Sequence, residues 1–225
     1  MEQLDELNAV LGSRDIVIVE GPDAKTYLHS QVSQDLRTQA IGEQQWTFLL
    51  QPTGKIDALA RVTRTGEERF ELDVDAGFGE ILLARINRFK IRVKAETALV
   101  TADDKLLGDH ASEAASELAR IELGWPRMGT EIIPGETIPV STGLNPIAVS
   151  FTKGCYPGQE LVERMDSRAA EAPRSLRRLT VVAGAAVGDP ILDGDQTVGV
   201  LTSVSGNSAL GWVRRSSEIG EPVQF

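Results

Sequence analysis

Apolar residues in the first half of the chain come in short runs, and their spacing predicts alternating strands and helices. The run from Ile16 to Val19 lies within residues 14–20 and predicts a buried strand. Gly21-Pro22-Asp23 follows directly, and a proline at the first helical position with an aspartate beside it predicts a helix start. Further strands are predicted, from apolar runs separated by turn residues, over residues 44–51, 55–63, 69–74 and 91–100.

Helical spacing of apolar residues reappears later and predicts helices over residues 79–89, 111–123 and 158–165. Residues 124–150 are rich in proline and glycine and are expected to form loops. After residue 173 the pattern changes to short strands between turns, predicted at residues 176–182, 198–204 and 209–213. We therefore expect an α+β fold in two domains, residues 1–170 and a small antiparallel β-barrel or sheet over residues 171–225.

The composition is that of an ordinary soluble globular protein: of 225 residues, 41% are apolar and 25% are charged. No stretch approaches the roughly 18 consecutive apolar residues of a membrane span. The acidic start of the sequence lacks the basic and apolar regions of a secretory signal, so the expected location is the cytoplasm.

The formal net charge of −10 disfavours general binding to nucleic acid, because an acidic surface repels phosphate. Two groups of basic residues nevertheless occur, one within residues 85–94 and one within residues 174–178. We expect both to be solvated faces with acidic partners elsewhere in the chain. A local cationic pocket for a small anion remains compatible with the overall charge.

Cys155 is the one cysteine of the sequence, so the chain forms no internal disulfide and builds no thiolate metal site by itself. It lies in the octapeptide Lys153-Gly154-Cys155-Tyr156-Pro157-Gly158-Gln159-Glu160. In an extended segment Lys153 shares a face with Cys155, and its charge favours the thiolate. Tyr156 offers a flat surface for a heteroaromatic ring, and the helix start that follows favours an anion. From the residues alone, a reactive loop and a buried structural thiol are about equally supported.

The octapeptide resembles the signature of the folate-binding YgfZ family, relatives of the T-protein, which is the aminomethyltransferase of glycine cleavage. The similarity covers most of the chain and includes Gly21 to Ala24 with Tyr27 to Asp35, the strands around Gly54-Lys55-Ile56 with Arg61 and Arg64, Arg120 to Gly124, and Gly199 to Ser203. The resemblance implies a folate-binding body of two interleaved lobes, here residues 1–170. A small C-terminal β-barrel is expected to pack with it around a central channel.

Tetrahydrofolate is the cofactor that the resemblance implies, and Glu122 matches a glutamate that binds the pterin ring in T-proteins. A carboxylate suits that role because it accepts the paired N–H donors of a pterin in fork geometry. The alternative is an exposed glutamate in the last helical turn, where its charge opposes the helix dipole. Further folate contacts are expected from Asp57, Arg61, Tyr156, Gln159 and Glu160.

One position departs from the T-protein pattern: Ala58 stands where T-proteins carry a catalytic aspartate. Asp57 is adjacent, but in a strand it faces the opposite side. Alanine supplies no proton, so aminomethyl transfer in the T-protein manner is not expected. Whether the chain is an enzyme at all stays open.

The family resemblance implies an accessory role in the assembly or repair of iron–sulfur clusters in client enzymes, with indirect effects on tRNA modification. In this hypothesis Cys155, assisted by Lys153, makes a transient thiolate contact, and the client supplies the remaining ligands. The alternatives are a folate-dependent one-carbon transferase that uses Asp57 or Lys153, and an interaction module that has lost its ligand. We expect a monomer with no resident metal, no direct nucleic-acid partner and no membrane association.

Overall fold

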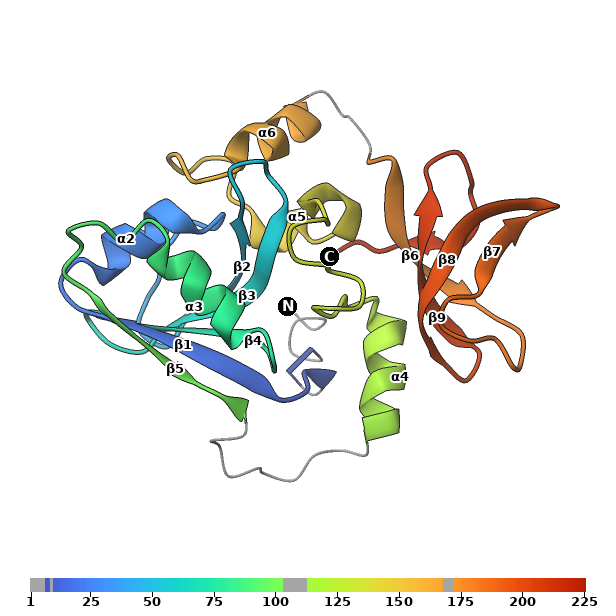
Figure 1. Ribbon diagram of the computed structural model, residues 1–225, viewed down its shortest axis with the longest axis horizontal. Coiled ribbons are helices and arrows are strands. Elements are labelled where there is room, and N and C mark those ends of the chain that lie inside the picture. Colours follow the sequence, from blue (N-terminus) through green and yellow to red (C-terminus); the bar gives the residue numbers. More distant parts are fainter. Residues whose placement is uncertain (1–6, 9, 103–112, 168–171) are drawn as a thin grey trace.

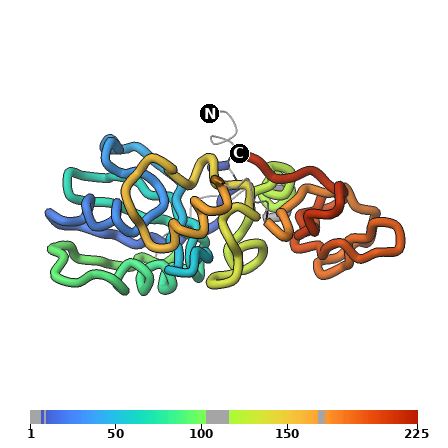
Figure 2. The backbone as a smooth tube through the Cα atoms, turned by 90° about the horizontal axis from the view of Figure 1, so that it is seen from above, coloured from blue at the N-terminus to red at the C-terminus, as the bar shows by residue number. Residues whose placement is uncertain are grey.

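Two antiparallel sheets, one built from each half of the chain, stand at opposite ends of the molecule with helices and loops between them (Figure 1). The computed structural model describes residues 7–8, 10–102, 113–167 and 172–225. Seen from above, the two ends lie far apart along the long axis, and the segment that joins them fills the middle (Figure 2). The predicted α+β fold is confirmed.

The first sheet has the order β2-β3-β4-β1-β5 and is antiparallel throughout. Its strands are β1 (Arg14–Glu20), β2 (Gln44–Leu50), β3 (Ile56–Arg64), β4 (Arg69–Asp75) and β5 (Glu96–Val100). Val17 and Val19 of β1 are fully buried, and β1 has a partner strand on each side. Helices α2 (Ala24–Gln31) and α3 (Gly79–Asn87) pack on this sheet and bury Leu28 and Leu82.

The prediction of a strand over residues 91–100 was wrong for its first half, because β5 begins only at Glu96. Arg92 has a φ of 57°, in the left-handed region, which interrupts an extended backbone. Ile91 is 78% exposed, so its apolar side chain marks a loop and no buried strand.

Four short or medium helices form the middle of the molecule: α4 (Glu113–Leu123), η2 (Pro139–Thr142), α5 (Asn145–Ala148) and α6 (Gln159–Ser167). The helices α4 and α6 were predicted, whereas η2 and α5 lie in the stretch predicted as loop. Pro139 and Pro146 each stand in the first turn of their helix, where a missing backbone N–H costs nothing. In the part of the chain that the structure describes, no helix has the length and apolar character needed to cross a membrane.

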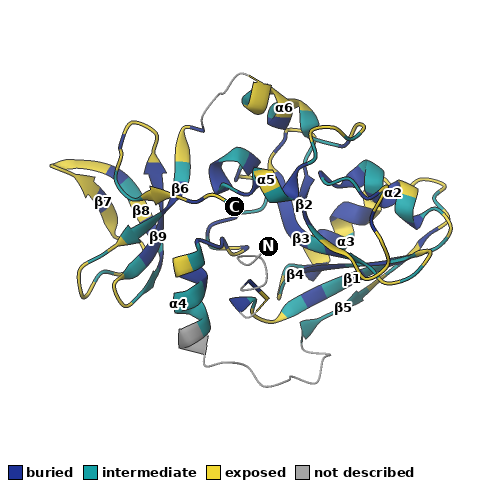
Figure 3. Cartoon of the chain, turned by 180° about the vertical axis from the view of Figure 1, so that it is seen from behind, coloured by how far each residue is buried: buried dark blue, intermediate teal, exposed yellow. Residues whose placement is uncertain are grey.

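The second sheet has the order β10-β6-β9-β8-β7. Its strands are β6 (Arg174–Thr180), β7 (Pro190–Asp193), β8 (Gln196–Ser205), β9 (Ser208–Arg214) and β10 (Glu221–Pro222). The face towards the middle packs Leu176, Leu210 and Trp212 against Ile121 of α4. The outer edge at β7 is largely exposed (Figure 3). The division into two domains stays a prediction, and its boundary at residues 170–171 lies outside the described residues.

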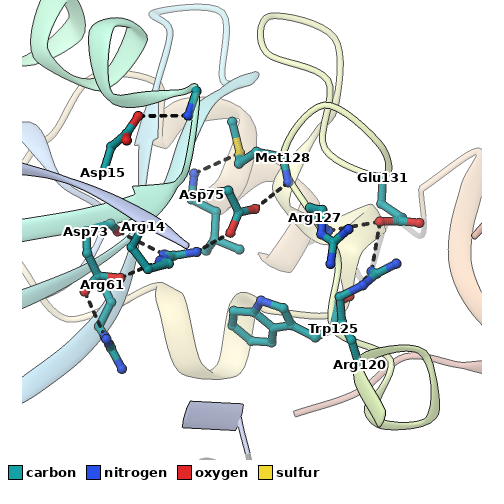
Figure 4. Close-up of polar contacts among 12 residues, drawn as sticks. Arg14, Asp15, Arg61, Asp73, Asp75, Arg120, Trp125, Arg127, Met128 and Glu131 are labelled. Carbon is teal, nitrogen blue, oxygen red and sulfur yellow. Dashed lines mark hydrogen bonds and ion pairs between the residues drawn. The ribbon is translucent and has the colours of Figure 1, made fainter. Parts of the chain in front are cut away.

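A buried ionic network ties α4 to the second sheet. Arg120 is 2% exposed, and its guanidinium lies 3.2 Å from the fully buried carboxylate of Glu131 and donates to the Ser203 hydroxyl at 2.7 Å. Figure 4 shows Arg120 and Arg127 converging on Glu131. Glu131 also accepts from Ser203 at 2.6 Å, and Arg120 donates to Trp125 O at 2.6 Å. Burial acts to lower the pKa of Arg120, but the carboxylates of Glu117 and Glu131 outweigh it and raise that pKa.

Candidate functional site

The octapeptide forms the last part of the loop between α5 and α6 and the first two residues of α6, and it packs against the turn that joins β2 and β3. A β-carbon built at Gly158 would lie 2.4 Å from Gln51 O, and one built at Gly54 would lie 2.4 Å from Leu161 Cβ. Both glycines have positive φ angles, 85° and 83°. The two turns therefore approach each other so closely that only glycine fits at the contact.

Lys153 anchors the start of the octapeptide to the end of α2. Its ammonium donates to the carbonyl oxygens of His29 at 2.5 Å, Val32 at 2.5 Å and Gln34 at 3.1 Å. These carbonyls belong to the last turn of α2 and to the residues just after it, where a cation is favourable. Burial lowers the pKa of Lys153 to about 8.

Tyr156 anchors the octapeptide on the other side of the cysteine. Its side chain is buried, and its ring lies 5.0 Å from the Lys153 ammonium. Its backbone N–H donates to Gln159 Oε1 at 3.0 Å, which fixes the loop at the start of α6. Burial, reinforced by Glu163, raises the pKa of Tyr156 to about 12, so its hydroxyl keeps its proton at neutral pH.

Cys155 is exposed between these two anchored residues. Within the described residues its thiol forms no disulfide and no hydrogen bond. Lys153 is turned inward to α2, so the expected pairing of its charge with the thiol is not formed. Of the two interpretations that the residues left open, the buried structural thiol does not describe this structure.

The other predicted folate contacts are scattered. Glu160 is exposed and pairs with Arg164 one helical turn later at 2.6 Å. Glu122 is exposed on α4 and lines a cavity of about 320 Å³ with Arg178 and Thr180. The helices α4 and α6 lie on opposite sides of the molecule in Figure 1, so Glu122 and the octapeptide are not brought together.

Asp57 is connected to the octapeptide by Gln51, the residue whose carbonyl oxygen Gly158 approaches. Its carboxylate accepts from Gln51 Nε2 at 2.8 Å, and its other oxygen lies 3.6 Å from Arg85 Nε. Ala58, the position of the missing aspartate, is fully buried and pairs with Leu49. Asp57 and Ala58 therefore face opposite sides of β3, as expected from strand geometry.

Arg61 belongs to a different cluster, around Trp46. It donates to Asp73 at 2.9 Å, and Arg14 donates to the other oxygen of the same carboxylate at 2.8 Å (Figure 4). Both guanidinium groups lie 5.7 Å from the centroid of the Trp46 ring, and the centroid of the Trp125 ring lies 4.4 Å from it. The structure thus gives Arg61 partners within the chain, and its contact with folate stays a prediction.

Arg85 was expected on a solvated face and is instead 3% exposed. It donates to Leu50 O at 2.9 Å and to Gln31 Oε1 at 3.1 Å, while its Nη2 has no partner among the described residues. Burial lowers its pKa. The helical spacing in the sequence indicates that Arg85 is buried, since it follows Leu82 by three positions on the apolar face of α3.

Two glycines of the octapeptide, Gly158 and Gly154, give a matched test of the close packing between the octapeptide and the β2–β3 turn. Gly158→Ala is expected to lower the free energy of unfolding by about 2–4 kcal/mol, since it adds both a strained backbone and a clash with Gln51. Gly154→Ala meets nothing within 4 Å and is expected to change it by less than about 0.5 kcal/mol. Urea denaturation of both variants measures the difference, and equal stabilities would contradict the close approach of the two turns.

Comparisons with known proteins place the chain among relatives. No family model matches it. It is 27% identical to an uncharacterized protein of Haemophilus influenzae over 69% of this chain and 67% of that protein. Two fungal proteins named iron-sulfur cluster assembly factor IBA57 homolog, mitochondrial, match as well. The Neurospora crassa protein is 23% identical over 78% of this chain, and the Pyricularia oryzae protein is 25% identical over 74%. The chain spans about half the length of these fungal relatives, 54% and 55%.

Among solved structures, the aminomethyltransferase T of the glycine cleavage system from Bartonella henselae has the same fold. The TM-score is 0.76 at 18% sequence identity, over 96% of this chain and 82% of that protein. These similarities confirm the resemblance predicted from the octapeptide: the chain has the T-protein fold and is similar in sequence to the two IBA57 homologs.

Proposed function

We propose that this chain is a tetrahydrofolate-binding accessory protein for the assembly or repair of iron–sulfur clusters in client enzymes, with Cys155 as its reactive thiol. The observation that supports it most is the exposure of Cys155 on a loop held in place on both sides, by Lys153 and by Tyr156. The names of the fungal relatives, iron-sulfur cluster assembly factors, support the same role. The cytoplasm stays the predicted location of this chain, whereas the names of the two fungal relatives place those proteins in mitochondria.

In this role Cys155 acts as one transient ligand to a cluster or to its sulfur. Iron–sulfur clusters are held by about four thiolates, so a client or carrier protein has to supply the others. An exposed thiol on a fixed loop suits such a handover, because a partner reaches it without a rearrangement of this chain. The cluster is the cargo of this reaction and not a resident group of the chain.

Glu122 is the residue proposed to hold the pterin of the folate. It lines a cavity of about 320 Å³, at the lower end of the range for ligand pockets, and no side chain among the described residues forms an ion pair with its carboxylate. A free carboxylate at a cavity fits the paired N–H donors of a pterin. A bound reduced folate supplies a carrier for one-carbon groups.

The one-carbon transferase alternative has less support. Ala58 has no group that exchanges a proton, and Asp57 is already engaged by Gln51 and lies near Arg85. A carboxylate that is already held by partners within the chain is poorly placed to exchange a proton with a bound substrate. The transferase would be favoured only if the purified chain formed methylenetetrahydrofolate from a methylene donor.

Titration of the purified chain with tetrahydrofolate under nitrogen tests the folate part. We expect saturable binding by the wild type and a loss of about tenfold or more in affinity for Glu122→Gln, since one charged bidentate contact is removed. Glu67→Gln changes another exposed glutamate, in the β3–β4 turn, and is the matched control with unchanged affinity. No binding by the wild type would contradict the proposal and would favour an interaction module that has lost its ligand.

A further inference from the structure

Two arginines lie directly opposite each other at one end of the second sheet. Arg174 opens β6 and pairs in register with Arg214, the last residue of β9. Both side chains are exposed, and neither has a carboxylate within ion-pair distance among the described residues. Like charges that face each other across an antiparallel pair are destabilising, so this arrangement calls for a compensating anion.

The arrangement is not typical of this sheet. Arg178 lies on the same strand and the same face as Arg174, yet it pairs with Glu221 at 3.1 Å. Arg174 is instead held over the ring of Trp212, with its guanidinium carbon 5.2 Å from the ring centroid. Such stacking orients the planar guanidinium and leaves its N–H edge available to a ligand.

Both arginines line a cavity of about 800 Å³ between the second sheet and the segment around η2. Across from them lie Thr137, Ile138 and Ser141, and Glu136 is the acidic residue of the lining. A volume of this order suits a small-molecule ligand. The lining holds three arginines, Arg174, Arg214 and Arg215, and one carboxylate, so the cavity is cationic within a chain whose net charge is −10.

We propose that this cavity binds a small molecule carrying two or more carboxylate or phosphate groups. Each guanidinium presents a fork of N–H donors that matches either oxyanion, and two forks on facing strands favour a ligand with more than one. Thr137 and Ser141 also line the cavity, but their hydroxyls already donate to Glu131 O and Ile138 O, so recognition of the anion rests on the guanidinium groups. The site is separate from the octapeptide and from Glu122, and it stands whether or not the proposed function holds.

Calorimetric titration of the full chain at constant ionic strength tests the site, with citrate as the carboxylate probe and pyrophosphate as the phosphate probe. We expect saturable binding of at least one of them at one site per chain, and the stronger of the two identifies the preferred class. Arg174→Gln and Arg214→Gln should each weaken it about tenfold or more. Arg69→Gln removes an arginine of the first sheet that has carboxylate partners and should leave the affinity unchanged.

Thermal unfolding gives a second readout that does not depend on heats of binding. Without an anion, Arg214→Gln should unfold at the same or a higher temperature than the wild type, because it removes one of two opposed like charges. The better probe should raise the Tm of the wild type and not that of the Arg174→Gln/Arg214→Gln double variant. The proposal is overturned if neither probe binds saturably, or if Arg69→Gln weakens binding as much as Arg214→Gln.

Discussion

Cells whose sole copy of this protein is Cys155→Ala are expected to lose most of the activity of its iron–sulfur clients, while the purified variant keeps the stability of the wild type. The stability expectation follows from exposure, since an exposed side chain without partners contributes within about 0.5 kcal/mol. The functional expectation follows from the sequence, which contains no other thiol to replace it. Client activity in extracts and urea denaturation of the purified variant measure the two parts.

The matched control for this experiment is Thr152→Ala, three positions before the cysteine. Thr152 is exposed, like Cys155, and within the described part of the chain its hydroxyl contacts the Ser150 hydroxyl, at 3.4 Å. Cells with this variant should retain client activity, so a loss specific to Cys155→Ala separates the thiol from the loop. Normal client activity with Cys155→Ala would show that the thiol is not required for the proposed function. The loop would then have at most a binding role.

Glu131→Ala is expected to destabilise the protein by about 3–5 kcal/mol, the largest effect on stability that the structure predicts. Glu131 is fully buried and accepts from Ser203, from Arg120 and from the backbone N–H of Arg127. Among the described residues, its removal leaves the buried guanidinium of Arg120 with one charged partner, Glu117. A loss of this size is a large part of the total stability of an ordinary domain, and denaturation by urea measures it.

The double variant Arg120→Met/Glu131→Leu separates the loss of the pair from the loss of one partner. Replacing both members of a buried pair with apolar residues of similar size is often neutral or stabilising, so this variant should be more stable than Glu131→Ala. Ser203→Ala removes only a hydroxyl that both charged groups contact and is expected to cost about 1–3 kcal/mol. A double variant no more stable than Glu131→Ala would show that the network does more than compensate charge.

Local patterns in the sequence were sufficient for most of the fold. The strand β1 was predicted with the bounds it has, because its apolar run is bordered by charged residues and by a glycine and a proline. Residues 91–95 were misassigned because Ile91 and Val93 alternate with basic residues as in a strand, and only the left-handed backbone of Arg92 shows otherwise. The helices η2 and α5 have four residues each, too few to produce a periodic pattern.

The candidate site was predicted less completely, because its partners are distant in the sequence. The octapeptide itself stood out by composition, and Cys155 is exposed as a reactive thiol requires. The partners of Lys153 lie more than a hundred positions earlier in the sequence. They are backbone carbonyls, which every residue has, so residue types do not predict this contact. The sequence also did not reveal the contacts of Asp57, because Gln51 reaches it across the β2–β3 turn and Arg85 reaches it from α3, and neither contact follows from residue type.

The anchoring of Lys153 also bears on when the thiol is presented as the chain is made. The three carbonyls that it binds precede it by 124, 121 and 119 positions. Contacts of such long sequence separation form late in folding, since the closure of a long loop has to precede them. During synthesis, α2 emerges from the ribosome well before the octapeptide, and the loop has nothing to attach to until both are out. Cys155 therefore takes up its fixed position only after both segments have emerged and packed together, and until then a nascent chain carries the thiol on an unanchored loop.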